Sequence, residues 1–375
     1  MMQHVIRGRG SLRAENLTAL MSQLGMERPL LVCGRRMAEV FAERVGMTLP
    51  VFSGYHPNPD LADCTAGAEM YRAQDCDGLI SLGGGSAMDT AKGVKALLLT
   101  GDMEAVKGSR LPADAPLPHI AIPGTAGTGA EATPFAVVYV DGQKLSLDHP
   151  ALLPEAVLLD SSLLDTLPDY HRKACAMDAL AQGIESYWAA HATQESRVHA
   201  AQAIRGVVFN MSAYLAGDAA AQEAMLEAAY ASGCAIRISR TTAAHAMSYQ
   251  ITRKLGHAHG HACMLTLPVL WARLYESGLC RAQLEEMAAL LGLPNGFYGS
   301  VLLQGLLLET GLDSREMPDD ALLDVLAASV NAQRLGNHPQ PLTAQELRAI
   351  YQEALTPMDW GTKEAALALW RQYGG

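Results

Sequence analysis

In the first part of the chain, short apolar runs alternate with stretches of helical periodicity. The runs at 29–33, 51–54, 78–82, 119–122 and 156–160 predict buried strands, and the apolar spacing at 37–45 and 62–72 predicts helices. Strands that alternate with helices in this way pair in parallel through right-handed crossovers. Residues 136–140, followed by the turn Asp141-Gly142, predict a small β-hairpin.

The pattern changes near Pro168. From about residue 169 onward, nearly every segment is rich in alanine and leucine and has the 3.6-residue period of a helix. We therefore expect two domains: an α/β, Rossmann-like domain of the nucleotide-binding type over residues 1–168, and an all-helical domain over residues 169–375. The stretch 357–375 predicts a terminal helix.

A glycine-rich turn follows the strand predicted at 78–82. The segment GGGSAMDTAK starts at Gly83, continues through Gly84, Gly85 and Ser86, and opens a helix that carries Asp89. Glycine lets the backbone approach a phosphate closely, and the free N–H groups at the start of a helix attract the anion. The turn therefore predicts binding of the cofactor pyrophosphate. A merely tight turn and, for Asp89, a solvated ion pair are the structural alternatives.

A second loop of this kind, PGTAGTGAE at 123–131, follows the next strand. Its glycines and the hydroxyls of Thr125 and Thr128 suit a backbone nest around phosphate or ribose, although a flexible surface loop would have the same composition. Two such loops after parallel strands indicate a dinucleotide that lies across both. Lys144 and Asn58, the latter in the turn HPNP, are further candidates for cofactor contacts.

Four of the twelve histidines fall between His245 and His261. Imidazole is a common ligand for divalent transition metals. In the helix predicted at 177–187, Asp178 lies among apolar residues, where an acidic side chain is costly to bury without a cation or hydrogen bonds. One interpretation groups Asp178 with His245 and His259 around a divalent ion. The alternatives are a histidine-rich turn at the surface and an aspartate that caps a helix.

The overall composition excludes several classes of partner. The 375-residue chain has a net charge of −11 and no run of lysine or arginine, which argues against nucleic acid and anionic membranes. No apolar run reaches the ~18 residues of a membrane span, and the first residues lack the apolar core of a secretory signal. Seven scattered cysteines fit reduced thiols that pack in the core. These features predict a cytoplasmic protein.

Together these motifs resemble the iron-containing (group III) alcohol dehydrogenases. The resemblance rests on the GGGS turn, the TAGTG loop, the helix DAL followed by IE, and two histidines fourteen residues apart, in order from about Val51 to Tyr351. It implies that residues 1–168 bind a dinucleotide and that the helical domain, residues 169–375, binds the substrate and a divalent metal. The metal would be Fe²⁺ or Zn²⁺, bound by Asp178, His245 and His259. The second ligand position of the family, usually histidine, is here Gln182, whose carboxamide oxygen is a poorer donor.

Shorter strings, among them RTTAAHA, HGHAC and KLSLDHP, resemble the phosphonoacetaldehyde reductase branch of this family. That resemblance implies NAD(P)H-linked reduction of a small aldehyde to a primary alcohol, here phosphonoacetaldehyde to 2-hydroxyethylphosphonate. A dianionic tail requires a basic anchor, for which Arg240 is our candidate, although an arginine on a helix surface is the alternative. His261 and Tyr249 are candidate relays for the proton that the alkoxide takes up.

The cofactor preference is predicted by the end of the first strand. Where NAD-dependent members of the family often have an aspartate for the ribose diol, this chain has Gly34, followed by Arg35 and Arg36. The absence of a carboxylate and the presence of two guanidinium groups favour the 2′-phosphate of NADP(H) over NAD(H).

We also expect a homodimer.

Three alternatives remain open from the sequence. The chain could act on simple short-chain alcohols and aldehydes rather than on a phosphonate. It could be a cyclase of the dehydroquinate synthase type, although the expected site is poorer in lysine and arginine than such enzymes require. Finally, Gln182 would also fit a relative that keeps its nucleotide loops and has lost its metal site.

Overall fold

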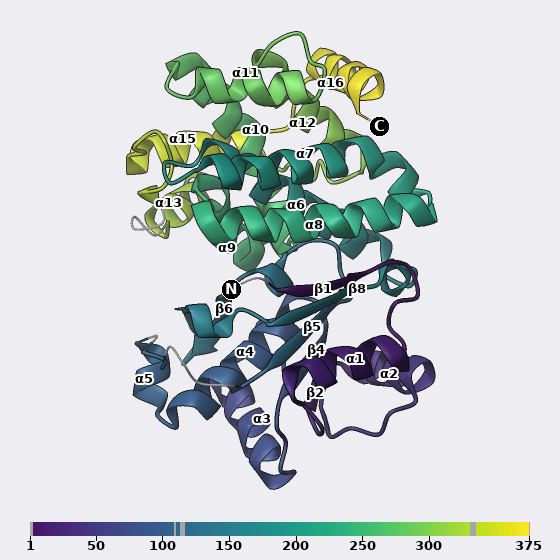
Figure 1. Cartoon of the computed structure of the whole chain (residues 1–375). Coiled ribbons are helices and arrows are strands. Elements are labelled where there is room, and N and C mark those ends of the chain that lie inside the picture. The colour runs from purple at the N-terminus through teal and green to yellow at the C-terminus, as the bar shows by residue number, and fades with distance from the viewer. Residues whose placement is uncertain (1–2, 109, 113–116, 331–334, 375) are drawn as a thin grey trace. The chain divides into compact units, whose positions relative to one another are not determined.

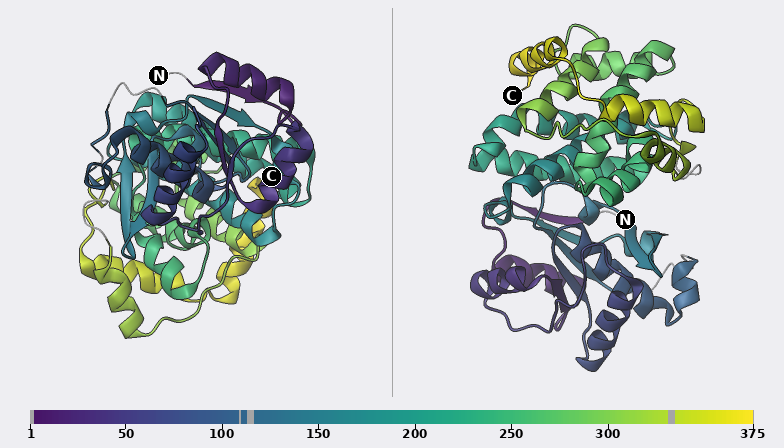
Figure 2. Two further views of the ribbon diagram at one scale, coloured as in Figure 1. Left: turned by 90° about the horizontal axis from the view of Figure 1, so that it is seen from below. Right: turned by 180° about the vertical axis from the view of Figure 1, so that it is seen from behind.

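The computed structural model describes residues 3–108, 110–112, 117–330 and 335–374. The chain divides into two compact units, Met1–Thr166 and Leu167–Gly375. The first unit is built on a parallel sheet with helices and the second consists of helices, as Figures 1 and 2 show. Among the helices of the described residues, none is both long and apolar enough to cross a membrane.

A six-stranded parallel sheet forms the centre of the first unit, in the order β1-β8-β5-β4-β2-β3. This arrangement confirms the predicted α/β class. The strands are β1 (His4–Arg7), β2 (Leu30–Cys33), β3 (Val51–Phe52), β4 (Leu79–Gly83), β5 (His119–Pro123) and β8 (Ala156–Leu159). Five of them coincide with predicted runs, whereas β1 was not predicted because its sequence, HVIR, is half polar and forms an edge strand.

Helices cover both faces of this sheet, and the side chains of each strand alternate between the two layers. Leu30 and Val32 of β2 pack in a core with α3 (Leu61–Ala73), α4 (Gly85–Thr100) and α5 (Met103–Lys107). Their neighbours Leu31 and Cys33 pack in a second core with α1 (Ala14–Leu24) and α2 (Arg35–Val45). Figure 1 shows the two layers on opposite faces. Burial on both faces explains why these strands are continuous apolar runs rather than alternating ones.

The predicted hairpin is formed by β6 (Phe135–Val140) and β7 (Gln143–Asp148), which pair antiparallel. Its turn is the Asp141-Gly142 pair, with φ values of 50° and 72°. Two-residue hairpin turns of this hand need positive φ at both positions, which asparagine, aspartate and glycine tolerate best. The turn residues therefore determine both the position and the register of the hairpin.

In the second unit, α6 (Asp169–Trp188) is the central helix: it is buried almost continuously from Ala174 to Trp188 and contacts α7, α8 and α10. Its neighbours in chain order are α7 (Gln194–Leu215), α8 (Ala219–Ser239), α9 (Ala243–Leu255), α10 (His259–Ser277), α11 (Arg281–Leu290), α12 (Phe297–Glu309), α13 (Asp320–Ala328), α15 (Ala344–Leu355) and α16 (Trp360–Tyr373). Because α6 is covered all round, any polar group on it needs a partner inside the unit.

A buried lysine holds the loop after β5 against α4, and a buried glutamate lies in the same loop. The ammonium of Lys92, on α4, donates hydrogen bonds to the carbonyl oxygens of Ala130 at 2.6 Å and Phe135 at 2.7 Å. Glu131 is also buried, and its Oε1 makes no hydrogen bond to a described residue. Burial raises the pKa of Glu131 to about 7, although the charge of Lys92 opposes this effect.

The raised pKa of Glu131 predicts a measurable dependence of stability on pH. Between pH 4.5 and about 7 the folded protein binds this proton more tightly than the unfolded chain does, so the residue's contribution to stability is lost as the pH rises. Glu131→Gln should therefore raise the free energy of unfolding at pH 8 by up to about 3 kcal/mol and leave it unchanged near pH 4. Urea unfolding at the two pH values measures the difference.

Glu155→Gln is the matched control, since the carboxylate of Glu155 already accepts a hydrogen bond from Lys95 at 2.8 Å. That variant should gain no stability at pH 8. Equal effects of the two substitutions at both pH values would show that Glu131 carries no burial penalty.

Candidate functional site: a nucleotide-type turn and a buried donor cluster

The two glycine-rich loops of the first unit lie side by side because β4 and β5 are neighbours. Gly83 pairs with Pro123 at the carboxyl ends of these strands, and the backbone N–H of Gly124 donates to the carbonyl of Gly83 at 2.8 Å. A Cβ on Gly124 would lie 3.2 Å from the Cα of Gly83. The close approach of the loops thus requires glycine, and it puts the start of α4 next to the TAGTG loop.

The predicted phosphate turn also depends on missing side chains. A Cβ on Gly84 would lie 3.3 Å from Thr125, and one on Gly85 would lie 3.2 Å from Thr128. The first turn of α4 therefore keeps its backbone N–H groups uncovered by side chains of its own, beside two threonines. A helix start of this kind suits an anionic ligand such as a pyrophosphate.

Other predicted cofactor residues gather at the same turn. The hydroxyl of Ser86 accepts a hydrogen bond from the backbone N–H of Asn58 at 3.2 Å, and Asn58 has a φ of 57°. Burial raises the pKa of Asp89 to about 6, while the charges of Lys92 and Lys144 lower it, so both lysines lie near this carboxylate. The structure thus brings together Asn58, Ser86 and the GGGS turn, with Asp89 and Lys144 close by.

The loop between β2 and α2 has no acidic side chain. Gly34 occupies the N-cap of α2, and Arg35 and Arg36 follow as its first residues, both exposed. A positive side chain at the N-terminus of a helix opposes the helix dipole. Two arginines at this place are compatible with an anionic partner.

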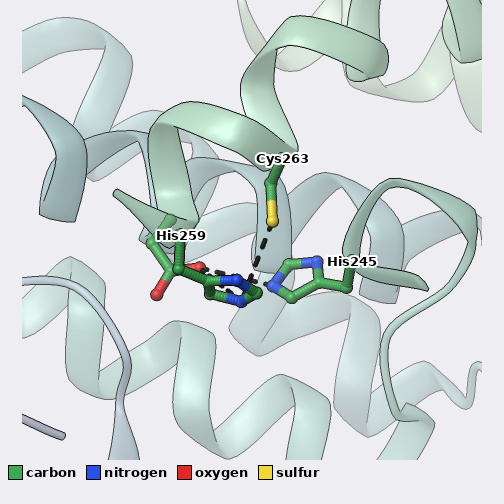
Figure 3. Close-up of side chains that lie close together, drawn as sticks. His245, His259 and Cys263 are labelled. Atoms are coloured by element: carbon green, nitrogen blue, oxygen red, sulfur yellow. Dashed lines mark hydrogen bonds and ion pairs between the residues drawn. The ribbon is translucent and has the colours of Figure 1, made fainter. Parts of the chain in front are cut away.

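Four side chains of the second unit point their donor atoms at one another. Asp178 comes from α6, His245 from α9, and both His259 and Cys263 from α10. One ligand atom from each lies within 4.8 Å of all the others, which is close enough to hold one metal ion. Figure 3 shows the sulfur of Cys263 directed towards the rings of His245 and His259.

The innermost atoms of this cluster lack ordinary hydrogen bonds. Asp178 and His245 are 3% and 4% exposed. Oδ1 of Asp178 lies 3.3 Å from Nε2 of His245 and 3.9 Å from Nε2 of His259. Neither Oδ1 of Asp178 nor Nε2 of His245 makes a hydrogen bond to any residue that the structure describes. Buried polar atoms are rarely left this way, and a shared cation would satisfy both.

Hydrogen bonds on the far side of each ring orient the imidazoles. Nδ1 of His245 bonds to Oε2 of Glu185, which can only accept, so this nitrogen carries the proton. The hydroxyl of Ser248 donates to the carbonyl of His245 and lies 3.2 Å from Nδ1 of His259, so it is available to accept from that ring. Both rings therefore present Nε2 lone pairs to Asp178 and Cys263, as metal-binding histidines require.

The electrostatics of the cluster favour bound positive charge. Burial raises the pKa of Asp178 and of Glu185, but other groups outweigh it and hold both pKa values below their ordinary ones. These groups are His245 and His259 for Asp178, and His245 and the hydrogen bonds from Thr242 for Glu185. Burial likewise raises the pKa of the Cys263 thiol, and His245 and His259 lower it to about 7. Burial lowers the pKa of His245, yet Cys263, Glu185 and Asp178 raise it well above its usual value. The donors are thus arranged for a cation.

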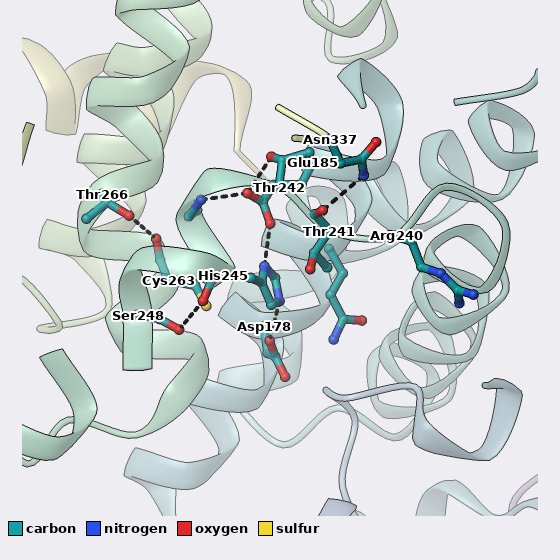
Figure 4. A network of polar contacts seen from close by, with 12 residues as sticks. Asp178, Glu185, Arg240, Thr241, Thr242, His245, Ser248, Cys263, Thr266 and Asn337 are labelled. Carbon is teal, nitrogen blue, oxygen red and sulfur yellow. Dashed lines mark hydrogen bonds and ion pairs between the residues drawn. The ribbon is translucent and has the colours of Figure 1, made fainter. Parts of the chain in front are cut away.

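Glu185 also fixes the start of α9. Its Oε1 accepts hydrogen bonds from the hydroxyl of Thr242 at 2.6 Å and from the backbone N–H of Ala244 at 2.7 Å. The amide of Asn337 then donates to the carbonyls of Ser239 at 2.7 Å and Thr241 at 3.0 Å. Figure 4 shows the resulting chain of contacts that ends at His245 and Asp178. The segment that leads to His245 is therefore fixed by hydrogen bonds to Glu185 on α6 and to Asn337.

Close packing of α10 on α6 completes the cluster. A Cβ on Gly260 would lie 2.1 Å from the carbonyl oxygen of Ala174 and 2.6 Å from the Cβ of Asp178. Only glycine fits between the two helices, and the residue before it is His259. Asp178 is not a helix cap, because α6 begins nine residues earlier, at Asp169.

Gln182 and His261 have partners outside the four-residue cluster. Oε1 of Gln182 accepts a hydrogen bond from Ser232 on α8 at 2.8 Å. Nε2 of His261 lies 2.8 Å from the carbonyl oxygen of Leu312, and its Nδ1 lies 3.2 Å from the hydroxyl of Tyr170. His259 and His261 are two positions apart on a helix, so their side chains leave it in different directions.

The two other predicted catalytic residues have different surroundings. The ring of Tyr249 stacks on that of His259, with centroids 5.6 Å apart. The guanidinium of Arg240 donates to the carbonyl of Arg237 at 3.4 Å, and Figure 4 shows it to one side of the contacts between His245 and Asp178. The backbone of Arg240 has a φ of 64°, an unusual value outside glycine that places a sharp turn between α8 and α9.

Sequence reasoning missed three contributors to this site: Cys263, Glu185 and Asn337. The interpretation of all cysteines as core packing overlooked that Cys263 follows His259 by four residues, which puts both on one helix face. Glu185 follows Asp178 by seven residues, two turns of the same helix, so its spacing was also available. No sequence pattern predicted a role for Asn337, because the turn residues that it contacts lie 96 and 98 positions earlier in the chain.

The role of Glu185 as the partner of His245 leads to a prediction about metal affinity. Glu185→Gln keeps the shape of the side chain and removes the charge that orients the imidazole. Loss of such an outer carboxylate typically weakens metal binding by 10–100-fold, and we expect an effect of about that size. Titration with Zn²⁺ against a competing chelator measures it.

Glu286→Gln is the control, since Glu286 accepts a hydrogen bond from Tyr187 in the same unit. It should leave the metal affinity unchanged. Equal Zn²⁺ affinity of Glu185→Gln and the unmodified protein would contradict the orienting role.

Comparisons with known proteins agree for both units. The model of the family "Iron-containing alcohol dehydrogenase" matches residues 3–161, and that of "Fe-containing alcohol dehydrogenase family, C-terminal" matches residues 173–355. A phosphonoacetaldehyde reductase of Streptomyces viridochromogenes is 38% identical over 225 residues, which cover 56% of this chain and 57% of that protein. The chain thus spans less than two thirds of the length of this relative.

Two further proteins are similar over more of the chain. A probable alcohol dehydrogenase, EutG, of Salmonella typhimurium is 31% identical over 278 residues, 73% of this chain and 68% of that protein. The crystal structure of a sulfoacetaldehyde reductase from Bifidobacterium kashiwanohense in complex with NAD⁺ superposes with a TM-score of 0.84 at 25% identity and covers 94% of this chain and 97% of that one. The chain belongs to the iron-containing alcohol dehydrogenase family.

Proposed function

We propose that the protein catalyses the NAD(P)H-linked reduction of a small aldehyde to a primary alcohol with the help of one divalent metal ion. The observation that carries the proposal is the buried donor cluster. In it, Oδ1 of Asp178 and Nε2 of His245 make no hydrogen bond to a described residue and lie 3.3 Å apart, beside His259. The nucleotide-type turn at Gly83 supports the proposal independently, since its geometry suits a dinucleotide pyrophosphate.

In the net reaction, an aldehyde, NAD(P)H and a proton give an alcohol and NAD(P)⁺. When bound, the metal supplies Lewis acidity at the aldehyde oxygen and the nicotinamide supplies the hydride. Asp178, His245 and His259 would hold the metal, and Glu185 would keep His245 in the tautomer that presents Nε2. The threonines beside Gly84 and Gly85 would line the cofactor turn. For delivery of the proton we favour Tyr249, whose ring stacks on that of His259, over His261, whose ring contacts Leu312 and Tyr170.

For the substrate, we propose phosphonoacetaldehyde, which yields 2-hydroxyethylphosphonate. The name of the Streptomyces relative supports this choice, and the sulfoacetaldehyde reductase acts on another two-carbon aldehyde with an anionic tail. Arg240 is our candidate anchor for the phosphonate. It lies five residues before His245, at the turn that Asn337 holds in place. A general short-chain alcohol dehydrogenase is the alternative that differs only in this anchor.

Kinetics with two aldehydes test the proposal. With NADPH and a metal-loaded protein, kcat/KM for phosphonoacetaldehyde should exceed that for propanal by about 100-fold or more, the effect of one charge-assisted anchor. His259→Ala should lose metal and lower turnover by at least about 100-fold, because several kcal/mol of transition-state stabilisation disappear. Elemental analysis and initial rates measure both.

Equal rates with the two aldehydes would favour the general alcohol dehydrogenase. Full activity of a metal-free sample would overturn the metal's role, and a protein that neither binds metal nor reduces any aldehyde would be a relative without catalytic activity.

For the cofactor, we propose a preference for NADP(H), supported by Gly34 at the end of β2 and by two exposed arginines behind it. Arg35→Ala should raise KM for NADPH by about 10-fold, the loss of one charge-assisted contact to the 2′-phosphate, and leave KM for NADH unchanged. Initial rates with both cofactors provide the measurement. Arg13→Ala removes another exposed arginine of this unit, paired with Glu15, and is the control. A strong preference of the unmodified protein for NADH would contradict the proposal.

A further inference from the structure

We propose that Cys263 is the fourth protein ligand of the metal, so that the centre is an Asp178–His245–His259–Cys263 set, and that its thiolate makes the site selective for Zn²⁺ over Fe²⁺. The proposal rests on the proposed function, because it concerns the same metal site. It assigns to Cys263 the position for which the sequence alone offered Gln182.

The geometry fits a tetrahedral ion. Zn–N and Zn–O distances of ~2.0–2.1 Å and a Zn–S distance of ~2.3 Å give tetrahedral edges of roughly 3.3 Å between nitrogen and oxygen and roughly 3.6 Å between nitrogen and sulfur. Nε2 of His245 and Oδ1 of Asp178 are 3.3 Å apart. Sγ of Cys263 and Nε2 of His259 are 3.8 Å apart. Nε2 of His259 and Oδ1 of Asp178 are farther apart, at 3.9 Å, and all four donor atoms lie within 4.8 Å of one another. Shifts of up to about 1 Å would therefore complete the set.

The thiol is placed by the helix that also carries His259. Cys263 follows His259 by four residues on α10, so both side chains leave the helix on the same face. Gly260, between them, lets this face lie directly against Asp178 on α6. Cys263 is buried, and its sulfur points at the two imidazoles rather than into the apolar core (Figure 3).

The atoms opposite the thiol are those that lack hydrogen bonds. Oδ1 of Asp178 and Nε2 of His245, both buried, are directed into the same space and make no hydrogen bond to described residues. Oε1 of Gln182, by contrast, accepts from Ser232 on α8. This hydrogen bond uses one of the two lone pairs of the carboxamide oxygen, whereas the thiol faces donor atoms that make no such contact to a described residue.

Charge balance favours the thiolate as well. A divalent ion bound by one carboxylate, one thiolate and two neutral imidazoles forms a neutral complex, which is less costly to bury than the singly positive complex with a carboxamide. Thiolate is a soft ligand that suits zinc, and tetrahedral sets of sulfur and nitrogen are typical of it. Zinc also accepts a fifth ligand, so four protein donors leave room for a substrate oxygen. The side chain of His259, 38% exposed, marks the open side of the cluster.

Spectroscopy of the metal tests the proposal without reference to activity. X-ray absorption by the zinc-loaded protein should show one sulfur at about 2.3 Å in the first shell. With Co²⁺ in place of zinc, the unmodified protein should absorb in the near ultraviolet through sulfur-to-metal charge transfer. Cys263→Ser should lose this band and bind Co²⁺ at least about 10-fold more weakly. Imidazole and carboxylate ligands already favour Zn²⁺ over Fe²⁺. In competition at equal concentrations, the unmodified protein should therefore prefer Zn²⁺ by a larger factor than Cys263→Ser does.

Cys280→Ser is the matched control, because Cys280 is a buried cysteine of the same unit at the start of α11. It should keep the band. A first shell of nitrogen and oxygen alone, or a band that survives in Cys263→Ser, would overturn the ligand role while a metal-dependent aldehyde reductase still stands. A protein that retains no metal at all would overturn both proposals. X-ray absorption needs no variant, so it decides the question even if Cys263→Ser does not fold.

Discussion

The structure of the helical unit depends on the pairing of two buried carboxylates on its central helix, α6, with one histidine. Asp178 and Glu185 lie two turns apart on α6, which is buried almost continuously over that stretch. An ionised carboxylate inside a protein must be paired, and here the two acids share His245: one faces Nε2 and the other Nδ1. The carboxylate of Glu185 therefore fixes the start of α9 through Thr242 and Ala244, and the two carboxylates together orient the ring of His245.

Small residues then decide how closely the other donors approach. Gly260 lets α10 lie on α6 so that His259 and Cys263 face Asp178, much as Gly83 and Gly124 let the two loops of the α/β unit touch. In each unit, a glycine without a side chain lets two backbone segments touch, and residues next to the glycine are the candidate binding residues. Glycine thus acts as a spacing element in both sites, although the ligands that they suit differ.

The sequence predicted the architecture well because each unit has its own regular pattern. Continuous apolar runs corresponded to strands buried on both faces, and Asp141-Gly142 located the hairpin. It predicted less where a single contact decides the outcome. The edge strand β1 is too polar to stand out, and β3 is only two residues long, shorter than expected. Asp178 was indicated by its apolar neighbours, and the pair His245 and His259 by the resemblance to the family. Asn337 could not be found, since no local pattern links it to residues 239–241.

The position of Asn337 has a consequence for the order in which the protein matures. Its amide closes the turn that leads to His245 from 98 residues away, and its Oδ1 accepts from the backbone N–H of His191. A nascent chain emerges from the ribosome N-terminus first and its domains fold as units. The α/β unit is complete by residue 166, but the turn between α8 and α9 gains the hydrogen bonds from Asn337 only when residue 337 has been synthesised. The turn that leads to His245 is therefore completed late in synthesis, after most of the helical unit has emerged.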